Sequence, residues 1–390
     1  MILRIILIIA LSCSAFSFCA APLFGSAAES MSAQRLMVAS KSPPNIPVQS
    51  IDFGGRQPGN AATHYLKAFE LLKYPESKTM GKEISEIIEN GWLQDSIEIK
   101  KLLQENELSI RQYQKGIAFI NCDFDFGKAP KYLFEKEFPA PAAWKLFSII
   151  MLKGRYHERQ NDYAAAVDLY LSALIFAQHI SQDNLEISKA TALVIGFSSL
   201  KPLKEYLNKK KVEKRLCEKI IVHLNQYHQQ RFEAREIIET RREETKSLLK
   251  MTADTFMAGV TETYRQRPEI LEKAAAFRKE FIMMAYQDID YYYGNYIRAT
   301  ETNKKKDWEF AASESENLKR AVQAEINADH KSTLLHCFLT NLDDPNPKCT
   351  ERTRIILMSG IPNYKYIFDQ YNRALAELRE VRSLAYERCE

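Results

Sequence analysis

The sequence is poor in the residues that interrupt helices. It has 13 glycines and 14 prolines among 390 residues, and they gather before residue 60 and at a few later points. Because glycine and proline are the strongest local breakers of regular structure, the long stretches between them favour helix. The apolar content of 46% is sufficient for a substantial core. Composition therefore predicts a folded, all-α protein of one large or two ordinary domains.

The sequence also lacks an excess of charge of one sign. The formal net charge is +4, from 54 Lys and Arg against 50 Asp and Glu. A surface that intersperses both signs does not concentrate a polyanion, so we expect no nucleic-acid partner. Two basic runs, 209–211 and 304–306, stand where one helical pattern gives way to the next. They are interpreted as solvated helix ends, with a weak contact to a membrane surface or a partner as the alternative.

No cysteine pattern indicates a disulfide framework or a metal site. Five cysteines follow residue 28, an odd number at irregular spacing. None forms a Cys-x-x-Cys or a paired Cys/His motif, so we expect no metal and no cofactor. Cys337 and Cys349 flank an Asp-Asp-Pro-Asn-Pro turn that could bring their sulfurs together in an oxidising compartment. Two unlinked thiols are the alternative.

Residues 1–28 have the pattern of an export signal. A single charge at Arg4 precedes an apolar run, and the run ends in small residues up to Ala28, where we predict cleavage. If it is not cut, the apolar run is long enough to span a bilayer. Lipidation at Cys13 or Cys19 is a further alternative. In every case the body is exported, to the periplasm or cell envelope or as a secreted protein, and we expect contact with a membrane only through this segment if it is not cleaved.

The remainder divides into a linker and a helical domain. Residues 29–59 are rich in Ser, Pro, Gly and polar residues, as in a flexible linker, and residues 60–390 carry the helical patterns. Within them, the segment near 119–141 alternates Asp with Phe and contains three prolines, which predicts a short non-helical stretch and a candidate subdomain joint. We also expect an interruption near Pro202 and one long charged helix over 212–258.

One stretch has the spacing of a packed helical hairpin. The small and aromatic residues that carry it are Gly154, Tyr163, Ala166, Tyr170, Ala173 and Leu174. They resemble the small residue of the first helix and the Tyr, Ala and Leu series of the second helix of a tetratricopeptide repeat, over residues 147–178. The resemblance implies antiparallel helices that meet through Gly and Ala notches filled by Tyr rings.

The repeat pattern does not recur at a fixed period. Similar offsets begin near residues 60 and 364, so we expect an irregular helical-hairpin (TPR-like) solenoid or bundle and not a regular array. The segment 122–200 is also similar to a group of exported bacterial helical proteins of uncharacterised function. That similarity implies location and fold, and no chemistry.

No residue pattern completes a catalytic motif. Asn121, Asp123 and Asp125 have the spacing of a calcium loop, but its later glycine and glutamate positions are not matched. Glu314 and Ser315 match the start of the lytic transglycosylase motif, and the elements that should follow are absent. We therefore assign no catalytic residue.

Four tyrosines close in sequence are the preferred partner-binding surface: Tyr291, Tyr292, Tyr293 and Tyr296. Tyrosine offers a large apolar face with a polar tip, which suits contact with a peptide or a sugar. Consecutive residues on a helix point in several directions, so a core and boundary role is the alternative.

Taken together, these patterns predict an exported helical scaffold that binds a protein or peptide between its hairpins and has no catalysis of its own. The alternative is an envelope hydrolase acting on cell-wall or glycan material through unrecognised carboxylates. A concave face with two inward carboxylates of raised pKa would indicate the enzyme, and a groove without such a pair would indicate binding.

Overall fold

The computed structural model describes residues 57–92, 96–124, 138–183, 185–209, 211–230, 233–328 and 364–389. Within these ranges the chain forms twelve helices and one two-stranded sheet, so the all-α class expected from composition is confirmed. The expected export signal, most of the expected linker and the cysteines at 337 and 349 lie outside the described residues.

The N-terminal layer contains the only strands among the described residues. Its elements are β1 (Gln57–Asn60), α2 (Ala62–Leu71), α3 (Lys78–Asn90), α4 (Ile97–Glu105), α5 (Glu107–Ile117) and β2 (Phe119–Asn121). β1 pairs in parallel with β2, and the backbone N–H of Ala61 donates to the Asn121 carbonyl at 2.8 Å. Residues 57–59, expected in the linker, therefore belong to the folded body.

The core of the body is a stack of four helices: α6 (Ala140–Arg159), α7 (Tyr163–Ser181), α8 (Glu186–Leu207) and α9 (Lys214–Gln230). α7 packs against α6, α8 and α9. Among the described helices, α7 alone is long and apolar enough to cross a membrane, and 83% of its apolar window is buried inside the body. Burial on all sides accounts for its apolar sequence.

Two expected helix boundaries are wrong. α8 continues through Pro202, which is buried within it. Packing of α8 against α7 and α15 (Lys365–Cys389) holds the helix together despite the missing N–H donor. The long helix expected over 212–258 is two helices. Glu233 takes an extended conformation and starts α10 (Ala234–Thr263) with a capping box, in which its N–H donates to Glu236 Oε1 at 2.8 Å.

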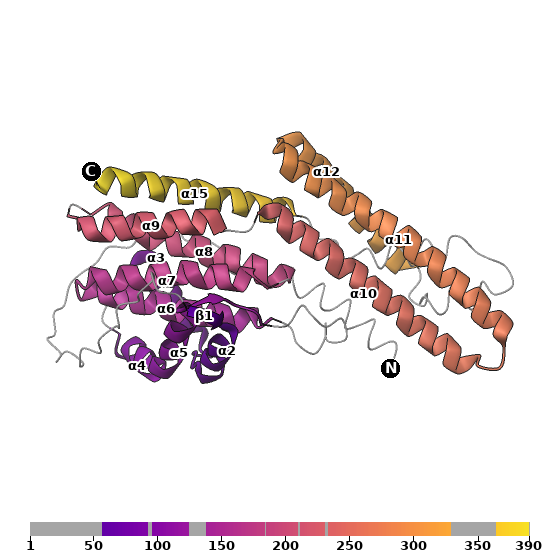
Figure 1. Cartoon of the computed structure of the whole chain (residues 1–390), viewed down its shortest axis with the longest axis horizontal. Helices are drawn as coiled ribbons and strands as arrows, with labels where there is room; N and C mark the ends of the chain where they lie inside the picture. Colours follow the sequence, from indigo (N-terminus) through magenta and orange to yellow (C-terminus); the bar gives the residue numbers. More distant parts are fainter. Residues whose placement is uncertain are drawn as a thin grey trace.

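α10 and α11 (Pro268–Thr302) form a long antiparallel hairpin that reaches away from the body, with α12 (Lys305–Ala328) folded back along α11 (Figure 1). We call α10 and α11 the arm. At 1.5 Å per residue α10 alone is about 45 Å long. The buried seam of the arm consists of Leu249, Ala253, Phe256 and Val260 from α10 and Ile270, Ala274, Phe281 and Ala285 from α11. α15 returns from the arm and covers α8 and α9.

Candidate functional site

The α6–α7 hairpin packs through a glycine notch. The ring of Tyr170 lies against Gly154, and a Cβ atom added at Gly154 would stand 2.9 Å from Tyr170 Cζ. Tyr170 is fully buried. Tyr163 is half-buried, and its ring lies 5.7 Å from that of Tyr206. The other predicted packing residues are also buried: Ala166, Ala173 and Leu174.

Two further glycine notches join helices outside that hairpin, and neither was foreseen from the sequence. An added Cβ at Gly116 of α5 would lie 2.5 Å from Cε1 of Tyr65 in α2. An added Cβ at Gly196 of α8 would lie 2.9 Å from Cζ of Tyr227 in α9. Their partners are 51 and 31 residues away in sequence, so no local spacing could reveal them. In the body, three pairs of helices therefore approach closely where a tyrosine ring packs against a glycine.

The tyrosines expected to form one binding surface are divided between core and surface. Tyr293 and Tyr296 are fully buried, and both rings pack on Tyr364, at centroid distances of 5.9 and 5.3 Å. The hydroxyl of Tyr296 donates to Ser315 at 3.0 Å. For these two residues the partner-binding prediction is wrong, because Tyr293 faces Thr245 of α10, Tyr296 faces α12, and neither presents a surface.

Tyr291 and Tyr292 remain near solvent. Tyr291 is 49% exposed. Its hydroxyl donates to Glu314 Oε2 at 2.9 Å, and this hydrogen bond joins α11 to α12. The half-buried ring of Tyr292 meets that of Tyr291 edge-on at 5.3 Å. Glu314 and Ser315, the pair that resembles a transglycosylase start, are thus both occupied in packing α12 against α11.

Tyr291 belongs to a wider exposed surface formed by α11 and α12. Phe310, 51% exposed, lies one turn before Glu314 on the same side of α12. Gly294 follows Tyr291 by about one turn, and a Cβ added there would meet no atom within 4 Å. Two exposed cations, one on each helix, lie between these aromatics and the turn that joins α11 to α12. We call this surface the α11–α12 face and define it by Tyr291, Gly294, Arg298, Lys306, Phe310 and Glu314.

A second polar site lies where the arm leaves the body. Arg241 of α10 pairs with two carboxylates, Glu186 Oε2 of α8 at 3.5 Å and Glu244 Oε2 at 3.1 Å. Glu244 also accepts the backbone N–H of Glu186 at 2.8 Å. Burial raises the pKa of both carboxyl groups above the usual value, and the charge of Arg241 opposes that rise. Burial also raises the pKa of the neighbouring Tyr293 to about 12.

This junction contains two carboxylates of raised pKa, the feature that would indicate acid–base chemistry. Arg241 binds both of them, however, and the backbone at the start of α8 occupies Glu244 as well. The ion pair of Glu186 with Arg241 and the hydrogen bond from the Glu186 N–H to Glu244 hold α8 to α10. This cluster is therefore a structural joint that fixes the position of the arm relative to the body.

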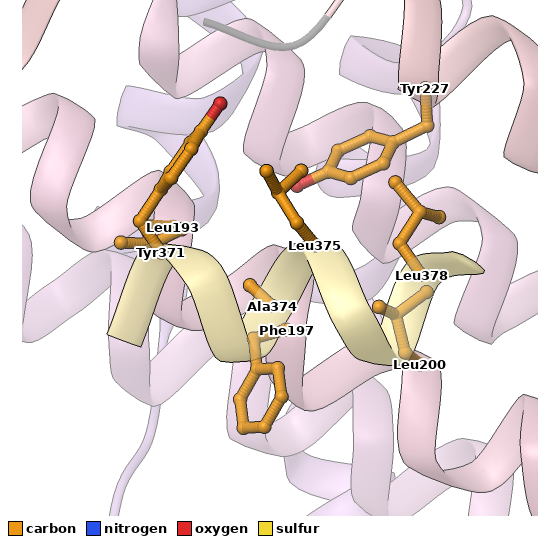
Figure 2. Close-up of a pocket in the computed structure, with 8 residues that line it drawn as sticks. All are labelled: Leu193, Phe197, Leu200, Tyr227, Tyr371, Ala374, Leu375 and Leu378. Carbon is orange, nitrogen blue, oxygen red and sulfur yellow. The ribbon is translucent and has the colours of Figure 1, made fainter. Parts of the chain in front are cut away.

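A shallow hollow, partly open to solvent, lies between α8, α9 and α15 (Figure 2). Its lining is aliphatic and aromatic throughout: Leu193, Phe197, Leu200, Tyr227, Tyr371, Ala374, Leu375 and Leu378. The hydroxyl of Tyr371 is directed to Glu233 Oε2 at 2.8 Å. Without convergent polar groups such a hollow has no means of orienting a substrate for reaction.

The other titratable candidates serve local structure. Nδ1 of His157 lies 3.2 Å from Asp162 Oδ2, at the turn between α6 and α7. The backbone N–H of Asp123 donates to Asn60 Oδ1 at 2.8 Å, which joins the segment after β2 to β1, and Asp125 lies outside the described residues. Within the described ranges no group of three His, Cys, Asp or Glu side chains is placed to hold a metal ion.

Comparisons of the chain with protein-family models, with curated proteins and with solved structures give no match.

Proposed function

We propose that this protein is an exported helical scaffold that binds a polypeptide through the α11–α12 face and has no catalysis of its own. The observation that carries the proposal is the exposure of two large aromatic side chains, Tyr291 and Phe310, on adjoining helices. Exposed aromatic residues grouped on one surface are typical anchors of protein interfaces.

The form of the α11–α12 face indicates what it binds. Gly294 leaves open space beside Tyr291, into which an apolar side chain of a partner can pack. Arg298 and Lys306 are exposed on the same side and add positive charge to the rim. The favoured partner is therefore a polypeptide segment with an apolar side chain next to acidic residues.

The α11–α12 face lies at the root of the arm, where Glu301 of α11 pairs with Arg235 at the start of α10 at 2.8 Å and α12 folds back along α11 (Figure 1). A partner bound there would contact two helices whose inner sides are already packed, so it would not disturb the core of the body. The partner class and the exported location both continue the expectations drawn from the sequence.

Site-specific photocrosslinking tests the proposal. A photoreactive amino acid is placed at position 291 or 310 of the full chain in its native envelope. The control position is Ile97, a residue of the body that is 80% exposed. We expect one polypeptide species to be captured from both face positions and not from Ile97. Replacing Arg298 and Lys306 together by Glu should reduce that capture. The same species captured equally from Ile97, or none from either face position, contradicts the proposal.

The hydrolase alternative has one observation in its favour, the raised pKa of Glu186 and Glu244. Purified full-length protein incubated with isolated cell-wall material should release no soluble fragments. Release that is lost in Glu244→Gln and retained in Glu314→Gln would replace the scaffold proposal with an enzyme centred on the junction.

A further inference from the structure

The C-terminal helix runs antiparallel to α9, and polar contacts fix its register. Asn225 of α9 donates to the Tyr386 hydroxyl at 2.9 Å and accepts from Arg382 Nε at 3.0 Å. The C-terminal end of α15 therefore lies beside the beginning of α9 (Figure 1). Along an antiparallel pair, a step toward the start of one helix matches a step toward the end of the other.

That register brings two cysteines to the same level. Cys217 lies about two turns before Asn225 in α9, and Cys389 lies about two turns after Arg382 in α15. Cys217 is fully buried in the core, and Cys389 is half-buried and packs against that core. Burial raises the pKa of the Cys217 thiol, and Cys389 and Arg388 are both charged neighbours that act on it, as this antiparallel register requires.

We propose that Cys217 and Cys389 form a disulfide bond that fastens the end of α15 to α9. The structure holds both as free thiols. Oxidation closes residues 217–389 into one covalent loop and fixes the helix that covers α8 and α9. This inference uses neither the α11–α12 face nor its partner.

The reaction is thiol–disulfide exchange with an external disulfide, such as glutathione disulfide or an oxidoreductase of the exported compartment. The more exposed Cys389 thiolate attacks one sulfur of that disulfide, forms a mixed disulfide and releases one thiolate. The Cys217 thiolate then attacks the Cys389 sulfur and releases the second. Two electrons pass to the external disulfide, and the two protons from the cysteines are taken up by the released thiolates.

The test uses the purified full chain, reduced and then incubated with glutathione disulfide. Remaining thiols are alkylated under denaturing conditions, and the unreduced protein is digested and analysed by mass spectrometry. We expect a peptide in which Cys217 is linked to Cys389, and an alkylated Cys122, which lies after β2 in another layer. Alkylation of both Cys217 and Cys389 after oxidation, or linkage of either one to Cys337 or Cys349, overturns the proposal.

Thermal unfolding provides a second readout. Each variant is compared with itself, oxidised against reduced, so that a loss of stability from the substitution itself cancels. Oxidation should raise the melting temperature by about 5–10 °C in the unmodified chain and in Cys122→Ser. In Cys389→Ser, which alters a half-buried residue of the last turn, the rise should be absent. An equal rise in Cys389→Ser would also overturn the proposal.

Discussion

At the scale of single residues, absent side chains decide how the helices of the body meet. Gly154, Gly116 and Gly196 each give room to a tyrosine ring from another helix. Glycine in a helix costs about 0.5–1 kcal/mol relative to alanine. The close contact between a buried ring and a bare backbone offsets that cost, since dispersion and apolar burial both increase when helices approach.

Replacing Gly154 by alanine should therefore destabilise the protein even though alanine is the better helix former. Tyr170 is fully buried and has no room to withdraw from the new methyl group. We expect a loss of about 1–3 kcal/mol in the free energy of unfolding, as for overpacked cores. Gly81→Ala in α3 is the matched control, because an added Cβ there meets nothing within 4 Å. It should stabilise by about 0.5–1 kcal/mol. Urea unfolding that gave both variants the same sign would contradict this account.

At the scale of elements, the sequence predicted what local spacing determines. The α6–α7 hairpin could be read from Gly154 and Tyr170 because both residues lie in adjacent helices with a short turn between them. The helix break at Glu233 was missed, since the Glu233-x-x-Glu236 capping signal lies among the many charged pairs of an exposed helix.

The division of the tyrosine cluster could not be predicted from one helix alone. Neighbouring positions on α11 differ by about 100° in direction. Which of them is buried depends on where α12 and Tyr364 pack, and Tyr364 is about 70 residues away in sequence. The same limit applies to Phe310, whose exposure beside Tyr291 is set by the antiparallel return of α12.

The arm leads to a prediction about the stability of a single element. Two helices that bury one seam have less apolar area to hold them than the layered helices of the body. Phe281 is fully buried in that seam, and its replacement by alanine should cost about 3–5 kcal/mol, felt mainly within the arm. We expect faster amide hydrogen exchange over residues 249–285 and little change in α7.

Met283 provides the control for this measurement. It lies on the same helix, two residues from Phe281, and is 54% exposed. Met283→Ala should leave exchange in the arm close to that of the unmodified protein. If Phe281→Ala instead accelerated exchange in α7 as much as in the arm, the arm and the body would unfold as one cooperative unit.

At the scale of the whole molecule, the junction of Glu186, Arg241 and Glu244 connects the layered body to the arm. Its three charged groups are held by one another and by the backbone at the start of α8. A cluster of this kind contributes little net stability compared with an apolar joint, because the charges must be removed from water. It does fix one arrangement, since any other would leave a buried charge without its partner.

The raised carboxyl pKa values make this joint sensitive to pH. Because burial raises the pKa of Glu186 above its ordinary value of 4.5, the folded state binds more protons than the unfolded state just above that pH. The contribution of this group to the free energy of unfolding is therefore greatest at low pH and falls as pH rises through the folded pKa.

Glu186→Gln tests this prediction, because it keeps the shape of the side chain and removes its titration. Relative to Glu186→Gln, the unmodified protein should lose stability to urea as the pH rises from 4.5 through the raised pKa of Glu186. Glu239→Gln is the matched control, because it removes a carboxylate of the same helix that pairs with Arg235 and lies outside the joint. If the stability of Glu186→Gln followed that of the unmodified chain at every pH, Glu186 would not be the titrating group of the joint.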